Sequence, residues 1–107
     1  MTIRISYRSD LYLGEGMKGK KLDKIKKILE RKPLFSNVFL VSISRNFSDQ
    51  LEIYDAKQLF WRYYRKHPPY VVGIACDKQE AVRLVEKMVM DCLGDRGDCK
   101  LKEYLRC

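Results

Sequence analysis

The sequence predicts a single α+β domain, in which a mixed four-stranded sheet carries its helices on one face. Short apolar runs bounded by turn residues alternate with two longer segments of helical periodicity. A length of 107 residues suits one core, and a hydrophobic fraction of 46% is typical of a folded chain. A two-layer packing is the simplest arrangement, and a ferredoxin-like one is a candidate. We expect one domain over residues 1–107, with residues 1–9 as a flexible or strand-like N-terminal extension.

The first half of the chain predicts a strand, a helix and a second strand. The run "DLYLGE" (10–15) gives a short apolar strand that is ended by glycines. Residues 19–32 predict a helix that ends at Pro33. The apolar residues of this helix recur on one face: Leu22, Ile25, Ile28 and Leu29. The β-branched and aromatic run "NVFLVSIS" (37–44) predicts a strand, and the succession favours a right-handed crossover.

The second half begins with a hairpin. A loop over 45–49 is followed by "QLEIY" (50–54), which alternates polar and apolar residues as a half-buried strand does. Residues 55–66 are ambiguous, because their spacing fits a helix while their aromatic side chains favour a strand. The run "YVVGIAC" (70–76) predicts a buried strand.

A second helix follows this strand. Asp77 is expected to cap it, with Glu80 completing an acidic capping box, and the helix is expected to end near Leu93, at Gly94. Its apolar face is wider than a simple amphipathic stripe, and Met90 lies within the polar face. This pattern is typical of a deeply buried helix and also favours a contact between two copies of the chain.

Composition excludes several classes of protein. No stretch approaches the roughly 18 apolar residues of a membrane span, and the first residues lack the apolar core of a signal peptide. We therefore expect a cytoplasmic protein with no membrane contact. The cysteines form no C-x-x-C pair, and His67 lies nine positions from the nearest of them, which argues against a zinc site. We expect free thiols, no metal ligands and no cofactor.

The segment "GEGMKGKK" (14–21) resembles two phosphate-binding motifs, G-x-G-x-x-G and G-x-x-x-x-G-K. The second motif needs a hydroxyl to bind Mg²⁺ at the position of Lys21. The first needs an acidic residue about 20 positions after the glycines, and residues 35–40 contain none. We therefore interpret the segment as a glycine turn between a strand and a helix.

The net charge of +8 is concentrated in the first half of the chain. Residues 1–45 carry eleven Lys and Arg against four Asp and Glu, whereas residues 46–107 carry eleven against ten. Four cations are spaced to form a basic ridge on the first helix, opposite its apolar face: Lys20, Lys24, Lys27 and Arg31. Such a ridge either binds a polyanion or is only a solvated helix face.

A second candidate surface combines aromatic and basic residues. Its members are Trp61, Arg62, Tyr64, Arg65, Lys66 and His67. Aromatic rings beside cations can stack bases of single-stranded nucleic acid, but they are equally typical of protein interfaces. No residues suggest catalysis: no serine lies in a G-x-S-x-G turn, and His67 has no evident nucleophile partner.

Four segments together resemble a group of small bacterial proteins that have no assigned activity: "LYLGEG…KKLDKIKKILERKP", "SDQLEIYDAKQL", "YYRKHPPYVVGIA" and "KEYL". The resemblance covers nearly everything after Asp10. It implies a free-standing domain and transfers no catalytic residues.

These observations favour a non-enzymatic binding or interaction module that self-associates. The alternative is binding of RNA or another polyanion through the basic ridge. An enzyme that acts on a phosphorylated small molecule ranks third.

Overall fold

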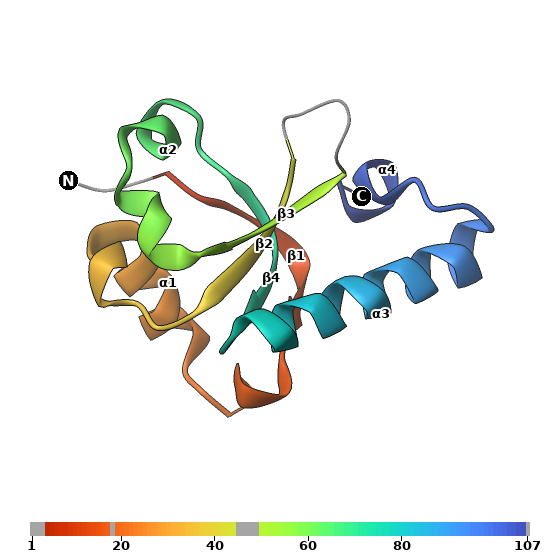
Figure 1. The fold of residues 1–107 in the computed structure, drawn as a ribbon, viewed down its shortest axis with the longest axis horizontal. Coiled ribbons are helices and arrows are strands. Elements are labelled where there is room, and N and C mark those ends of the chain that lie inside the picture. Colours follow the sequence, from red (N-terminus) through yellow and green to blue (C-terminus); the bar gives the residue numbers. More distant parts are fainter. Residues whose placement is uncertain (1–3, 18, 45–49, 107) are drawn as a thin grey trace.

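The computed structural model describes residues 4–17, 19–44 and 50–106. Its centre is a four-stranded sheet in the order β1–β4–β2–β3 (Figure 1). The strands are β1 (Ser6–Leu13), β2 (Phe39–Ile43), β3 (Leu51–Asp55) and β4 (Tyr70–Ala75). β1 and β4 are parallel, and the other two pairs of neighbours are antiparallel. The expected α+β class with a mixed four-stranded sheet is confirmed.

The last strand lies between the first two, so β1 and β2 are not neighbours. The strand–helix–strand succession at the start of the chain is therefore not a crossover between adjacent parallel strands. β1 also begins earlier than the sequence suggests, because Ser6 and Tyr7 already pair with Tyr70 and Val71 of β4. The final residues of the expected extension over 1–9 thus belong to the sheet, while residues 1–3 lie outside the described residues.

Helices connect and cover the strands. The α-helices are α1 (Leu22–Arg31), α2 (Arg62–Lys66), α3 (Lys78–Arg96) and α4 (Leu101–Arg106). Three short 3-10 helices are η1 (Glu15–Met17), η2 (Pro33–Phe35) and η3 (Ala56–Phe60). No helix in the described ranges is long and apolar enough to cross a membrane.

The helices pack on both faces of the sheet, where the sequence led us to expect them on one. Along β4, Val71 and Ile74 point into a core shared with α1 and η3. Val72 and Ala75 point into a second core shared with α3 and α4. Because both sides of β4 are apolar, both faces of the sheet have to be covered. The resulting arrangement has three layers, with the sheet between two layers of helices. It therefore differs from a ferredoxin-like packing, which has two layers.

Two further elements differ from expectation or resolve an ambiguity. Most of the ambiguous segment 55–66 is helical, because η3 and α2 follow Asp55, the last residue of β3. α3 passes through Gly94 and ends at Arg96, because Gly97 is the residue with the left-handed backbone (φ 78°) that terminates it. The expected hairpin loop over 45–49 lies outside the described residues.

Candidate functional site

The glycine-rich segment binds a carboxylate of the protein itself. Oε2 of Glu80 accepts a hydrogen bond from the backbone N–H of Gly16 at 3.0 Å. Oε1 of the same carboxylate accepts one from the N–H of Cys76, also at 3.0 Å. Glu80 is only 9% exposed. The first turn of α3 therefore places an internal anion against the loop that a phosphate-binding protein would use for its ligand.

The glycines are needed to make room for this carboxylate. A Cβ atom on Gly14 would lie 1.8 Å from Oε1 of Glu80, and one on Gly16 would lie 2.5 Å from Sγ of Cys76. Neither distance is possible without moving the neighbouring side chain. Close packing thus explains Gly14 and Gly16, while Gly19, the third glycine of the motif, has a left-handed backbone (φ 83°) with nothing within 4 Å of an added Cβ.

The polar groups around Glu80 form hydrogen bonds that hold the start of α3 in place. Asp77 caps α3 as expected, because its Oδ1 accepts the N–H of Glu80 at 2.8 Å. Glu80 does not complete the capping box on Asp77, since its carboxylate bonds to Cys76 instead. Burial alone would raise the pKa of Glu80, but the amides of Cys76 and Gly16 outweigh it and hold the pKa below its usual value.

The Cys76 thiol is not activated. Its Sγ lies 3.1 Å from Oε2 of Glu80, and this hydrogen bond, with burial, raises its pKa. A thiol held in the protonated form is a poor nucleophile. Cys76, Cys92 and Cys99 are free, and no group of three or more potential metal ligands occurs among the described residues.

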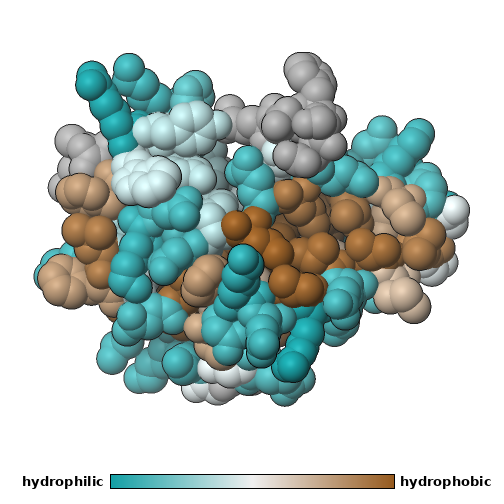
Figure 2. Space-filling model, viewed as in Figure 1, coloured by the Kyte–Doolittle hydropathy of each residue, from teal (hydrophilic) through white to brown (hydrophobic). Residues whose placement is uncertain are grey.

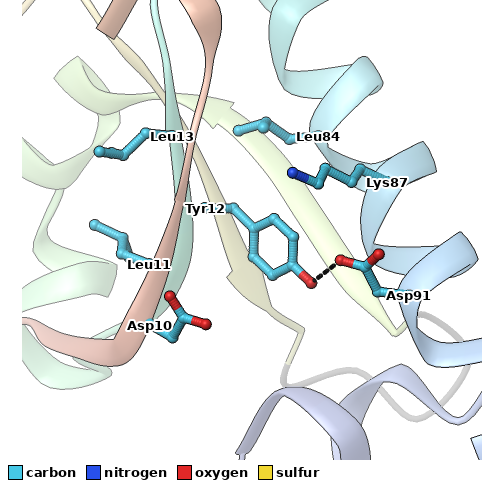
Figure 3. A pocket seen from close by; sticks show the side chains of 7 residues that line it. All are labelled: Asp10, Leu11, Tyr12, Leu13, Leu84, Lys87 and Asp91. Carbon is cyan, nitrogen blue, oxygen red and sulfur yellow. Dashed lines mark hydrogen bonds between the residues drawn. The ribbon is translucent and has the colours of Figure 1, made fainter. Parts of the chain in front are cut away.

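A groove of about 330 Å³ lies between the edge strand β1 and α3. It is lined by Asp10, Leu11, Tyr12, Leu13, Leu84, Lys87 and Asp91 (Figure 3). The Tyr12 hydroxyl donates a 2.7 Å hydrogen bond to Oδ2 of Asp91, which ties the strand to the helix. Burial first, and this bond second, raise the pKa of Tyr12, so the phenol stays protonated. Sequence patterns do not predict this site, because its two hydrogen-bonded residues, Tyr12 and Asp91, are 79 positions apart in the chain.

Two cations flank the Tyr12 ring. The Lys87 Nζ lies 6.0 Å from the ring centroid, and the Arg8 guanidinium carbon lies 5.5 Å from it. Arg8 also forms a 3.8 Å ion pair with Asp10, while its Nε is buried without a hydrogen-bond partner. With the phenol and carboxylate bonded to each other, the groove has groups suited to binding and no evident acid–base pair for catalysis.

The basic ridge is shorter than expected. Lys24, Lys27 and Arg31 are exposed on α1, and none has an ion pair with another described residue. Lys20 is exposed as well, but it lies in the turn before α1, which begins only at Leu22. Lys20 instead lines a small hollow of about 180 Å³ that also includes Phe35. The helix therefore presents three of the four expected cations.

The aromatic and basic surface is divided between solvent and core. Trp61 is 58% exposed, and Arg62, Lys66 and His67 are exposed beside it. Tyr64, in contrast, is half-buried and stacks on Tyr54 with ring centroids 5.1 Å apart. The Arg65 side chain lies outside the described part of the structure. Tyr63, which was not among the candidates, is 50% exposed and contacts the His67 ring at 4.8 Å.

An apolar band lies at the β3 edge of the sheet, the edge opposite β1, where β3 lies beside α3 (Figure 2). Its half-buried members are Leu51, Ile53, Val85 and Val89, and its exposed members are Val82 and Leu93. Met90, 68% exposed, lies on the solvent side of the same helix. Large exposed apolar areas on a small domain are typical of interaction surfaces.

Among the described residues, no strand pairs with the outer edge of β3 next to this band. Ser44 donates to the carbonyl of Gln50 at 3.1 Å, and Ala56 donates to the carbonyl of Val38 at 3.0 Å. Hydrogen-bonded pairs alternate along an antiparallel ladder, so the even-numbered residues of β3 face β2. The N–H and C=O groups of Leu51, Ile53 and Asp55 therefore point away from the sheet.

Comparisons with protein-family models, with curated proteins and with solved structures find no match.

Proposed function

We propose that this protein is a non-enzymatic interaction module that self-associates through the β3–α3 surface. The observation that carries the proposal is the coincidence of an open strand edge with an apolar band along the same strand. An edge strand next to apolar side chains is a template for pairing with another chain. A second copy supplies both the strand and the apolar surface that this face lacks.

The pairing follows from the register. Two β3 strands placed antiparallel about a two-fold axis bring Ile53 opposite Ile53 of the second copy, and Leu51 opposite Asp55. Their outward N–H and C=O groups then bond across the axis, and the two sheets join into one. Such a contact is isologous, with the same patch on both copies, and its closed symmetry stops assembly at a dimer.

The charge distribution favours this face over the others. The surface is built from residues 51–93. They belong to the half of the chain (46–107) that contains eleven Lys and Arg and ten Asp and Glu, so its net charge is close to zero. The basic α1 packs on the other face of the sheet. Two copies joined at β3 therefore keep their most basic surfaces apart, and repulsion between like charges is small at the contact.

Sedimentation equilibrium at several concentrations tests the proposal. The double variant Val82→Lys, Leu93→Lys places charges at two exposed positions of the band and is expected to remain monomeric. Trp61→Lys is the matched control, because it adds a charge at an exposed position of the aromatic surface and should leave association unchanged. Salt should preserve or strengthen association. A strictly monomeric wild-type protein, or a loss of association in the Trp61 variant alone, contradicts the proposal.

Binding of a polyanion through α1 is the second candidate, favoured by three exposed helical cations without ion pairs and by Lys20 just before them. Binding of single-stranded RNA would weaken with salt and be indifferent to sequence. Four phosphate contacts give a slope of about −3 in log K against log[salt]. Lys24→Glu with Lys27→Glu should abolish it, whereas Lys78→Glu with Lys100→Glu should weaken it far less. Absence of RNA binding at about 50 mM salt would leave the ridge a solvated face.

A further inference from the structure

We propose that the groove between β1 and α3 binds an extended peptide segment with a carboxylate side chain, which adds to the sheet beside β1. This inference goes beyond self-association, because it concerns the opposite edge of the sheet. Ser6 donates to the carbonyl of Pro69 at 3.1 Å, and Gly14 donates to the carbonyl of Ile74 at 3.0 Å. The register of the β1–β4 pairing shifts between Tyr7 and Tyr12, so the orientation at the groove follows from the end of β1 alone. There Tyr12 pairs with Gly73 and Gly14 bonds to Ile74, while the side chains of Leu11 and Leu13 lie in the other core from that of Tyr12. Leu11 and Leu13 therefore turn their backbone groups to the groove.

The groove has the shape that strand addition requires. One wall is the edge of β1 at residues 10–13, and the other is the side of α3 that carries Leu84, Lys87 and Asp91 (Figure 3). At about 3.3 Å per residue, four strand residues offer about 13 Å of backbone edge, which matches a peptide of about four residues. Main-chain hydrogen bonds would hold such a peptide, and the helix would select its side chains.

The groove is lined by one cation, Lys87, and by two carboxylates that already have partners, Asp10 with Arg8 and Asp91 with Tyr12. We therefore expect Lys87 to select a carboxylate on the peptide. Lys87 and Asp91 are four residues apart on one helix, a spacing that normally gives an ion pair. Here the Asp91 carboxylate bonds to the Tyr12 hydroxyl at 2.7 Å, and no ion pair forms between Asp91 and Lys87. Figure 3 shows the Lys87 ammonium directed toward the Tyr12 ring and away from Asp91. The cation thus lacks a carboxylate partner among the described residues, at a point where a bound strand would pass.

A nucleic acid fits less well than a peptide. A nucleic acid strand has no alternating N–H and C=O groups to bond with Leu11 and Leu13. A net charge of +8 on the chain also attracts an acidic peptide over long range.

Fluorescence anisotropy with a labelled heptapeptide, Thr-Val-Asp-Val-Asp-Val-Thr, tests this proposal. Two further peptides carry N-methyl groups at every second residue, one peptide at its odd-numbered residues and the other at its even-numbered residues. Strand addition uses the N–H groups on one side of the peptide, so methylation in one frame should abolish binding and methylation in the other should preserve it. A version with Lys in place of Asp should not bind. The monomeric variant Val82→Lys, Leu93→Lys should bind the peptide as wild type does, which separates this test from that of self-association.

The variants locate the site. Lys87→Gln should weaken peptide binding about tenfold or more. Lys78→Gln removes the same charge from the same helix outside the groove and should change binding less than about twofold. In NMR spectra, the amides of Leu11 and Leu13 should shift when peptide is added. Equal binding by both methylated peptides, equal losses in the two Lys variants, or shifts at Leu51 and Ile53 instead would each overturn the proposal.

Discussion

Oε2 of Glu80 lies 3.0 Å from the backbone nitrogen of Gly16, a residue 64 positions earlier in the chain. This hydrogen bond joins the glycine-rich loop to the first turn of α3. The other oxygen of the carboxylate bonds to the N–H of Cys76 at the end of β4. One side chain thus connects a loop, a strand and a helix, and stability should depend on it strongly.

Glu80→Ala should lower the free energy of unfolding by about 1.5–3 kcal/mol, because two amides lose a charged acceptor. Glu80→Gln should cost less, since it keeps the shape and one acceptor oxygen. Urea unfolding followed by circular dichroism measures both differences. A matched control is Glu86→Ala, at an exposed position of the same helix, which should change stability by less than about 0.5 kcal/mol. Similar losses in the Glu80→Ala and Glu86→Ala variants would show that the loop connection contributes little.

The contribution of Glu80 should depend on pH. Its pKa in the folded protein is below the usual 4.5, because the amides of Cys76 and Gly16 stabilise the charged form despite burial. Its stabilising contribution is therefore fully present above about pH 4.5 and lost as the pH falls through the folded pKa. The stability difference between wild type and Glu80→Gln should shrink below pH 4.5. Other carboxyl groups titrate equally in both proteins and cancel. A difference that stays constant down to pH 3 would contradict this assignment.

Local patterns in the sequence predicted local structure well. Asp77 was identified as a helix cap, and the strands near 37–44 and 70–76 were placed correctly, because capping and β-propensity depend on residues close in the chain. The Glu80–Gly16 bond could not be predicted in this way. Nothing near Gly16 indicates that a carboxylate 64 positions later will occupy its amide.

Hydrophobic periodicity also did not predict that helices cover both faces of the sheet. The run "YVVGIA" is continuously apolar, which is typical of a strand covered on both faces. Its position between β1 and β2, however, depends on contacts between distant segments. The groove at Tyr12 and Asp91 depends on the same strand order. β4 lies next to the edge strand β1, and α3, which follows β4 in the chain, therefore packs close to β1. Sequence patterns alone therefore identified the elements but not the surface between β1 and α3.

Two glycines should respond to alanine in opposite directions. Gly14→Ala should destabilise by about 2 kcal/mol or more, because its Cβ would lie 1.8 Å from Oε1 of Glu80 and displace the carboxylate. Gly94→Ala should stabilise by about 0.5–1 kcal/mol, because Gly94 lies within α3 with nothing within 4 Å of the added Cβ. Chemical denaturation measures both.

A double-mutant cycle checks the cause of the first effect. In a Glu80→Ala background, Gly14→Ala should cost much less than in wild type, because the carboxylate that it displaces is already gone. Additive losses would mean that the alanine acts on the backbone and not on Glu80.

The thiols should react at different rates. Cys99 is exposed, whereas Cys92 is buried and burial raises its pKa. The Cys76 pKa is raised first by the hydrogen bond to Glu80 and then by burial. Alkylation at pH 8, followed by mass spectrometry, should therefore label Cys99 before Cys76 and Cys92. Glu80→Gln should accelerate labelling of Cys76 and leave that of Cys92 unchanged. Faster labelling of Cys76 than of Cys99 in the wild-type protein would refute the proposed effect of Glu80.

ATP and NAD(P) should not bind tightly, although "GEGMKGKK" matches two phosphate-binding patterns. The Gly16 N–H, which a phosphate would need, already bonds to a carboxylate whose negative charge repels another anion. Lys21 stands where a magnesium-binding hydroxyl is required, and an ammonium cannot coordinate a cation. Calorimetry with each nucleotide, with and without Mg²⁺, should show only weak binding that disappears as salt is raised to about 0.15 M, where exposed charges are screened. A micromolar signal that requires Mg²⁺ and is lost in Lys20→Ala would mean that the loop opens and exchanges Glu80 for a phosphate.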